Sequence, residues 1–287
     1  MNDFFIMKIR GKITMRIGSA LKKERLRMGL TQDEMIQGII KKSHYSKVER
    51  NLEGISADSL FEILFAHNID IDNFLDQIKD EYRSVGGKKA IKQNQEVMKA
   101  FNESATNKMQ EKLHDILQLK GQTIFKYRAI VSVAILSGQL NLLSPDLKKQ
   151  IFLQFAKYDN WFENVDALRL LANCLPIFKI EQLDNVINQL LRHYSKNRSY
   201  SERMIERIAI ICNNYLYYCF YSNVEGKNIS ACLKFLSNLD CSYHFLFYHI
   251  AGKFYLHLFK DEKNEARKIK KQLIYYGYKN LVSSWRT

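Results

Sequence analysis

Between residues 15 and 83, apolar positions recur at helical spacing in a series of short blocks. The first block carries Ile17, Ala20, Leu21 and Met28 on one face, and we expect this helix to end at Gly29, where a left-handed cap is favoured. Thr31 and Glu34 then have the spacing of a capping box, which predicts that a second helix begins there. Its expected buried residues are Met35, Ile36, Ile39 and Ile40, and its expected end is near Lys41.

The third block separates two faces of different chemistry. The residues expected to point inward are Tyr45, Val48 and Leu52, and those left facing outward together are Lys42, Ser43, Ser46, Lys47 and Arg50. Ser56 is placed to cap a fourth helix, and Asp72 to open a fifth. Short helices with a basic outer face on the third are typical of a helix-turn-helix domain of five helices.

The outward face of the third helix has the side chains that a major groove requires. Those expected to contact base edges are Lys42, Ser43, Ser46 and Lys47, and those expected to hold phosphate oxygens are Gln32, Arg50 and Asn51. The alternative is a small helical bundle with an ordinary solvated basic face. Agreement between caps, helix lengths, buried positions and charge favours the DNA-binding interpretation.

These residues also carry a family resemblance. The run GSALKKERLRMGLTQDEM followed by YSKVERN resembles the helix-turn-helix of phage Cro and repressor proteins and of many bacterial regulators. The resemblance implies a buried ion pair between an arginine of the first helix and a glutamate of the recognition helix, here Arg25 and Glu49. At the turn the pattern differs, because Ile39-Ile40-Lys41-Lys42 occupies the place where the family usually has glycine and Gly38 lies earlier.

Beyond residue 83 the pattern is one helix after another. The adjacent Gly86 and Gly87 predict a hinge, because two glycines together are unfavourable inside a helix. Ser144 and Pro145 predict a helix start, and further helices of about 12 to 20 residues follow, joined by short turns. We therefore expect an all-α protein with an extension at 1–14, a helix-turn-helix domain at 15–83, a linker at 84–98, and an α-solenoid of tetratricopeptide-like helix pairs at 99–287.

A closer resemblance lies in this second region. The segment YDNWFENVDALRLLANCLPIF, residues 158–178, is similar to the Rgg/GadR/MutR regulators, which carry a tryptophan and an acidic, leucine-rich helix at this distance after the DNA-binding domain. The resemblance implies a homodimeric, cytoplasmic transcription regulator of the quorum-sensing type. Its partners would be double-stranded DNA and a short signalling peptide.

An extended peptide needs external hydrogen-bond donors and acceptors, which asparagine and arginine provide. The candidate peptide-binding residues are Arg128, Arg169, Asn173, Asn213, Asn214 and Tyr217. Each asparagine could instead bond within the solenoid, and Arg169 could pair with Glu163 or Asp166. Residues 84–287 hold 30 Lys and Arg against 17 Asp and Glu, a net charge of +13, which favours a peptide with an acidic residue or a free carboxylate.

Other classes of function have little support in the sequence. There is no glycine-rich phosphate loop, nucleophile elbow or metal-ligand spacing, so we expect no enzyme activity, no metal and no cofactor. The five cysteines lack a C-x-x-C pair and are expected to be reduced, and no segment is long and apolar enough to predict a membrane span or an export signal. Two alternatives stay open: a phage- or antitoxin-type repressor whose helical domain binds a protein partner or only dimerises, and a solenoid scaffold that has lost DNA binding.

Overall fold

The structure, a computed structural model, describes residues 15–83, 86–88, 92–93, 95–96, 106–119, 121, 123–156, 160–195 and 200–287. The predicted extension at 1–14 lies outside these residues, and so does much of the predicted linker at 84–98. Every regular element in the described part is a helix, as predicted. Contacts within the chain divide it into two compact units, Met1–Lys89 and Ala90–Thr287, called here the first unit and the second unit.

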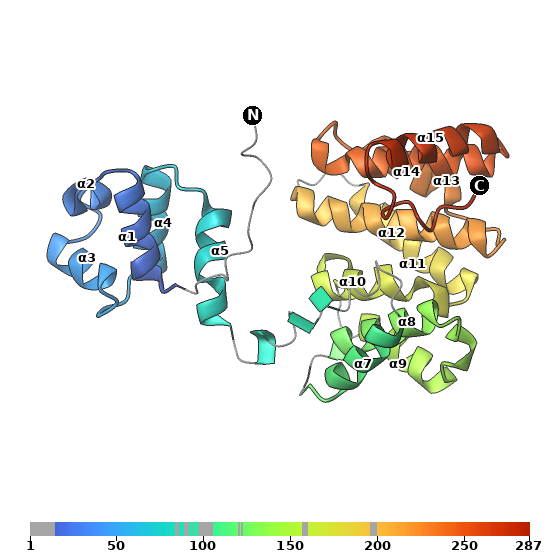
Figure 1. Cartoon of the computed structure of the whole chain (residues 1–287), viewed down its shortest axis with the longest axis horizontal. Coiled ribbons are helices and arrows are strands. Elements are labelled where there is room, and N and C mark those ends of the chain that lie inside the picture. Colours follow the sequence, from blue (N-terminus) through green and yellow to red (C-terminus); the bar gives the residue numbers. More distant parts are fainter. Residues whose placement is uncertain are drawn as a thin grey trace. The chain divides into compact units, whose positions relative to one another are not determined.

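The first unit contains the five predicted helices (Figure 1). They are α1 (Ile17–Arg27), α2 (Gln32–Ile36), α3 (Lys42–Glu49), α4 (Ala57–Ala66) and α5 (Ile71–Tyr82). Their buried side chains form one core that includes Leu21, Met35, Tyr45, Ile63 and Phe74. Packing of these amphipathic faces holds helices together that are too short to be stable alone.

The starts of α2, α4 and α5 in this unit are set by side-chain caps. The amide of Glu34 donates to Thr31 Oγ1 at 3.3 Å and the amide of Thr31 donates to Glu34 Oε2 at 2.7 Å, which confirms the predicted capping box. Ser56 caps α4 as predicted. At α5 the cap is Asp70, which accepts from the amide of Asn73, so the helix begins slightly before the predicted Asp72.

The end of α2 and the position of Leu52 were predicted wrongly. α2 ends at Ile36, because Gln37 and Gly38 both have positive φ, at 45° and 82°. Gly38 is thus the glycine of the turn, and Ile39 and Ile40 pack against the core from the connection that follows. Leu52 is 65% exposed because α3 ends at Glu49 and Asn51 turns the chain with a φ of 57°.

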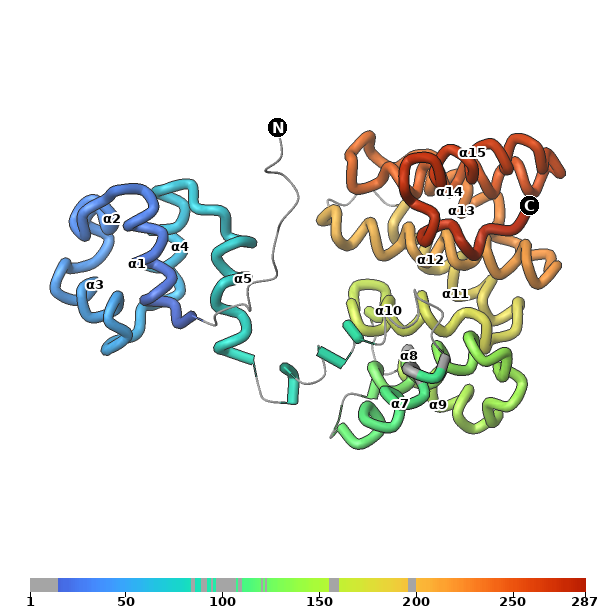
Figure 2. The backbone as a smooth tube through the Cα atoms, viewed as in Figure 1, coloured from blue at the N-terminus to red at the C-terminus, as the bar shows by residue number. Residues whose placement is uncertain are grey.

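The second unit is a stack of helices in chain order, from α7 at one end to α15 at the other (Figures 1 and 2). The helices are α7 (Thr106–Leu117), α8 (Thr123–Leu136), α9 (Pro145–Ala156), α10 (Val165–Cys174), α11 (Ile180–Tyr194), α12 (Glu202–Tyr221), α13 (Ile229–Ser237), α14 (Leu246–Phe259) and α15 (Lys263–Tyr275). Because α8, α10, α12 and α14 each pack against the next, they form one continuous layer. This is the predicted solenoid arrangement.

Local signals explain the starts of α9 and α10 in the second unit. Ser144 Oγ accepts from the amide of Leu147 at 3.2 Å ahead of Pro145, as predicted for α9. Asn164 accepts from the amides of Asp166 and Ala167 and so caps α10. Gly86 and Gly87 lie in a short helical segment at residues 86–88, and the hinge predicted there stays a prediction. Glycine disfavours a helix without forbidding it.

A buried polar network joins α11 to the connection before α13. Asp184 Oδ1 accepts hydrogen bonds from the Tyr215 hydroxyl, from the amide of Lys227 at 3.1 Å and from Asn228 Nδ2 at 3.3 Å. The Asn228 side chain also donates to the Asp184 carbonyl at 2.9 Å. Gly226 lies against the Tyr215 hydroxyl, where a Cβ atom would come within 2.2 Å. These contacts fix the spacing of α11 and α12 in the stack.

Candidate DNA-binding surface and ligand site

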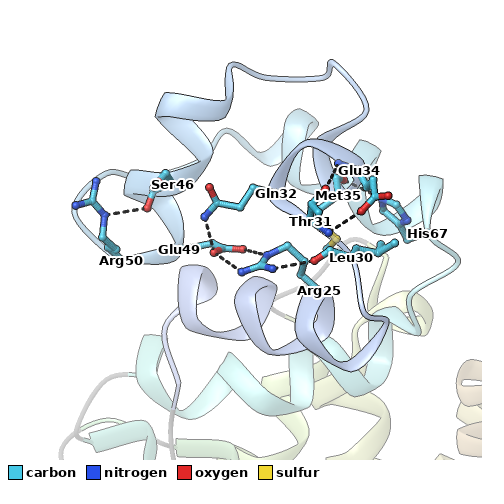
Figure 3. Close-up of polar contacts among 10 residues, drawn as sticks. All are labelled: Arg25, Leu30, Thr31, Gln32, Glu34, Met35, Ser46, Glu49, Arg50 and His67. Atoms are coloured by element: carbon cyan, nitrogen blue, oxygen red, sulfur yellow. Dashed lines mark hydrogen bonds and ion pairs between the residues drawn. The ribbon is translucent and has the colours of Figure 1, made fainter.

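The position of α3 is fixed by a buried ion pair with α1. Arg25 donates from Nε to Glu49 Oε1 at 2.5 Å and from NH2 to Glu49 Oε2 at 3.0 Å, in the two-pronged geometry typical of arginine and carboxylate (Figure 3). The two side chains are 11% and 3% exposed. Arg25 NH1 also donates to the Leu30 carbonyl at 2.8 Å, so one guanidinium holds α3 and the turn before α2 together. The ion pair implied by the sequence resemblance is therefore present.

Gln32 completes this arrangement from α2. Its Nε2 donates to Glu49 Oε2 at 2.9 Å (Figure 3). Burial acts to raise the pKa of Glu49, but the hydrogen bonds from Arg25 and Gln32 outweigh it and lower the pKa below its usual value. Glu49 is thus held as a carboxylate between three helices. The side-chain amide nitrogen of Gln32 already donates to Glu49 within the first unit. The phosphate contact predicted for Gln32 stays a prediction.

The predicted base-contacting residues share one face of α3. Tyr45, Val48 and Glu49 are buried on the other side of the helix, whereas Lys42, Ser43 and Lys47 are exposed and Ser46 is half-buried. Arg50 is exposed at the end of the helix, and its Nε donates to the Ser46 carbonyl at 3.1 Å (Figure 3). A polar, cationic helix face of this kind is suited to the major groove.

Asn51 has an internal role as well. Its Nδ2 donates to Ser19 Oγ at 2.7 Å, and its left-handed backbone turns the chain away from α3. Beside it, the backbone of Val48 lies so close to Gly18 that a Cβ atom on Gly18 would be 1.8 Å from the Val48 carbonyl oxygen. The phosphate contact predicted for Asn51 also stays a prediction.

Carboxylates on the same surface were not anticipated from the sequence. Glu53 Oε1 lies 2.7 Å from Lys47 Nζ, and Glu53 Oε2 lies 2.7 Å from His44 Nδ1. Lys42 is paired with Asp33 of α2. The hydrogen bonds from Lys47 and then His44 lower the pKa of Glu53 below its usual value.

In the second unit, the predicted peptide-binding residues lie on α8, α10 and α12. Arg128 Nε donates to Asn173 Oδ1 at 2.7 Å, which joins α8 to α10. Asn214 Nδ2 donates to the Ala172 carbonyl at 2.9 Å, which joins α12 to α10. These bonds within the stack are the alternative that the sequence left open for the asparagines. A peptide-binding role for them remains a prediction.

Arginines from three successive helices gather at this place. Arg169 on α10 lowers the pKa of Arg128 on α8, after the larger effect of burial, and it lowers the pKa of Arg207 on α12 in the same way. Arg169 NH1 lies 3.3 Å from Asp166 Oδ1, in an ion pair between two exposed side chains. Such a pair contributes little to stability, so it leaves Arg169 available to a ligand. Arg207 was not predicted from the sequence, because only the packing of α10 against α12 brings it near Arg169.

The remaining two candidates lie on α12 near this cluster. Asn213 Nδ2 donates to Asn214 Oδ1 at 3.2 Å, and no donor among the described residues reaches the buried Asn213 Oδ1. Tyr217 stacks against Tyr221 with ring centroids 4.5 Å apart. A buried acceptor without a donor is costly, and a peptide-binding role for Asn213 stays a prediction.

Solved structures resemble the chain over almost its whole length. The pheromone receptor Rgg2 of Streptococcus dysgalactiae matches with a TM-score of 0.67 at 15% identity, covering 94% of this chain and 97% of that one. PrgX in complex with iCF10 matches with a TM-score of 0.68 at 18% identity, covering 93% and 92%. A putative transcriptional regulator from Listeria monocytogenes matches with a TM-score of 0.72 at 19% identity, covering 94% of each chain. The chain has the fold of Rgg2 and PrgX.

The resemblance to Rgg regulators in the sequence is thereby confirmed at the level of the fold. No protein-family model matches the sequence, and no curated protein matches it significantly. The resemblance therefore rests on short motifs, such as residues 158–178, and on the fold.

The described residues bear on three further features: metal ligands, reactive thiols and membrane-spanning helices. No group of three or more His, Cys, Asp or Glu side chains in the described part of the chain is arranged to hold a metal ion. Cys174, Cys212, Cys219 and Cys232 are buried free thiols, and Cys241 is an exposed one. Burial raises the pKa of Cys174 to about 12 and that of Cys219 to about 11, so these thiols are poor nucleophiles. None of the described helices is long and apolar enough to span a membrane.

Proposed function

We propose that the chain is a sequence-specific DNA-binding transcription regulator controlled by a short signalling peptide. The observation that carries the proposal is the fixed position of α3. The Arg25 and Glu49 pair holds this helix against α1 while Lys42, Ser43, Ser46 and Lys47 face outward. Solved structures with the same fold include a pheromone receptor and a complex of a bacterial peptide pheromone with its receptor, which supports the peptide half of the proposal.

The regulator acts as a homodimer in the cytoplasm and catalyses no reaction. Two recognition helices about 34 Å apart read two half-sites on one face of the duplex, which gives specificity that a single short helix lacks. In each protomer, the side chains that hold phosphates fix the register on the duplex, and the side chains of α3 read the bases.

The peptide binds where Arg128, Arg169 and Arg207 converge on the layer of α8, α10 and α12. Arg169 lowers the pKa of both Arg128 and Arg207, and a carboxylate bound here would offset the repulsion between these cations, because its charge is opposite to theirs. The ligand is therefore a peptide with an acidic side chain or a free C-terminus near this cluster.

Selection of bound duplexes from a random DNA pool tests the DNA half of the proposal. The parent protein should enrich one sequence with two related half-sites about one helical turn apart. Substitution of Lys47 by alanine should weaken the enrichment. Recovery of no common sequence would contradict DNA recognition by α3.

Calorimetry tests the peptide half. A peptide encoded by a small reading frame beside the gene should bind, its C-terminal amide or Asp-to-Asn versions should bind more weakly, and Arg169→Ala or Arg207→Ala should remove that difference. The matched control is Arg192→Ala, an exposed arginine on α11 in another part of the stack. Equal affinity for all peptides would exclude the charge argument, and no binding would favour the peptide-independent repressor.

A further inference from the structure

Glu53 lies against the face of α3 that is proposed to enter the DNA. The chain leaves α3 through Asn51, whose left-handed backbone turns it back, and Glu53 follows two residues later. Each oxygen of its carboxylate takes a different side chain of the helix. Oε1 lies 2.7 Å from Lys47 Nζ, and Oε2 lies 2.7 Å from His44 Nδ1.

Lys47 and His44 are three residues apart, so they project from the same side of α3. Both are partly exposed, and so is Glu53. An ion pair between exposed groups is weak enough for a stronger partner to displace it. The surface therefore presents DNA with a lysine and a histidine that are already paired, next to a negative charge.

The pairing of Lys47 with Glu53 affects binding to non-cognate DNA and to the correct sequence differently. Binding to any sequence depends on cations that neutralise phosphates. A lysine held by a carboxylate neutralises no phosphate, and the carboxylate itself repels the phosphate oxygens nearby. On the correct sequence, a base acceptor replaces the carboxylate as the partner of Lys47, since lysine hydrogen-bonds well to the major-groove edge of guanine.

We propose that Glu53 is a specificity-determining residue, which suppresses binding to non-cognate DNA by holding Lys47 and His44 away from phosphate oxygens. The inference rests on the proposed DNA-binding function and assigns part of its selectivity to a carboxylate. Like-charge repulsion against the wrong partner is a general route to specificity.

The test compares Glu53→Gln with Glu62→Gln in the full-length protein. Glutamine keeps the shape of the side chain and removes its charge. Glu62 is exposed on α4, and no described basic side chain pairs with it, so its substitution makes the same change in net charge away from α3. Fluorescence anisotropy gives the affinity of each variant for the selected operator and for a scrambled duplex of the same composition, over a range of salt concentrations.

Glu53→Gln should bind the scrambled duplex on the order of tenfold more tightly, with much less change on the operator. Its salt dependence on scrambled DNA should steepen by about 0.9 for each additional phosphate neutralised. Glu62→Gln should match the parent on both duplexes. The double variant Glu53→Gln, Lys47→Gln should return toward the parent on scrambled DNA, because the released lysine is gone.

Three results would overturn the inference. Glu53→Gln could behave like Glu62→Gln, it could tighten binding to both duplexes equally, or the double variant could keep the full gain on scrambled DNA. A parent protein that binds its selected operator no better than scrambled DNA would instead overturn the proposed function itself, and the inference with it.

Discussion

Gly18 in α1 lies directly against the backbone of Val48 in α3. A Cβ atom at Gly18 would be 1.8 Å from the Val48 carbonyl oxygen and 2.7 Å from its carbonyl carbon, so only glycine allows the two helices to cross this closely. The crossing and the Arg25 to Glu49 pair together orient α3 on α1. The direction in which the predicted DNA-contacting side chains point therefore depends on these two contacts.

Substitution of Gly18 by alanine should force α1 and α3 apart. We expect a loss of about 1–3 kcal/mol in the unfolding free energy of the first unit, typical of overpacking, together with weaker binding to the operator. The chain has two tryptophans, Trp161 and Trp285, and both lie in the second unit. Circular dichroism should thus detect the loss, while the unfolding transition seen by tryptophan fluorescence should not move. An unchanged transition by both methods would contradict the close crossing.

Removal of Arg25 should leave a buried carboxylate without its partner. Arg25→Ala is expected to destabilise the first unit by roughly 3–5 kcal/mol, because Glu49 keeps its charge and loses both guanidinium bonds. Lys22→Ala, at an exposed position on the same helix, is the control. The double substitution Arg25→Met, Glu49→Leu should lower the unfolding free energy of the first unit by less than Arg25→Ala alone. Equal effects of Arg25→Ala and Lys22→Ala on the melting curve would show that the pair contributes nothing.

The first unit should also lose stability in acid through Glu49. The pKa of Glu49 in the folded chain lies below its ordinary value of 4.5, so its contribution is fully present above pH 4.5. That contribution is lost as the pH falls below 4.5 and through the lower, folded-state pKa. Denaturation followed by circular dichroism between pH 3 and pH 7 measures this, and Glu49→Gln should show a smaller dependence on pH. The same dependence in both proteins would assign the acid sensitivity to other groups.

The DNA surface should separate into residues that read bases and residues that position the protein. Ser43→Ala or Lys47→Ala should reduce discrimination between operator and scrambled DNA, by about 1–3 kcal/mol for each lost base contact, whereas Arg50→Ala should weaken binding to both. Gln32→Ala should also weaken both, with an added loss of stability, because Gln32 donates to Glu49. Anisotropy titrations on the two duplexes provide the comparison. Uniform losses across the set would contradict the assignment.

The network around Asp184 should hold the second unit together independently of DNA binding. Asp184→Ala leaves the buried Tyr215 hydroxyl without its acceptor and removes the side-chain acceptor of the Lys227 amide, and a buried group left unpaired costs roughly 1–3 kcal/mol. Tryptophan fluorescence should report this loss, while operator binding by the first unit is kept at low denaturant. Asp240→Ala, at an exposed position, is the control. A loss no larger than that of the control would show that the network is dispensable.

Much of the helical order was predictable from short-range signals. The caps at Thr31, Ser56 and Ser144 follow from side chains within three residues along the chain. The end of α2 was misread because Ile39 and Ile40 continue the apolar pattern past Gly38. Helical spacing alone does not show where the backbone leaves the helix.

The parts of the sites that could not be predicted depend on long-range packing. Arg128 and Asn173 are 45 residues apart in the chain, and Asp184 and Asn228 are 44 apart. Glu53 is only six residues from Lys47, yet its contact requires the left-handed turn at Asn51. Non-glycine residues rarely adopt that conformation, so a sequence gives little indication of it.

The effect of the peptide on operator affinity tests the central claim most directly. Fluorescence anisotropy of the selected operator, titrated with full-length protein in the absence and presence of saturating peptide, gives two dissociation constants. The account predicts that they differ by about 5- to 150-fold, and that operator DNA changes the affinity for peptide by the same factor, because coupling between two sites is reciprocal. It also predicts that Arg169→Ala and Arg207→Ala bring the two constants together. Superimposable curves with and without a peptide that binds by calorimetry would contradict control of DNA binding by the peptide.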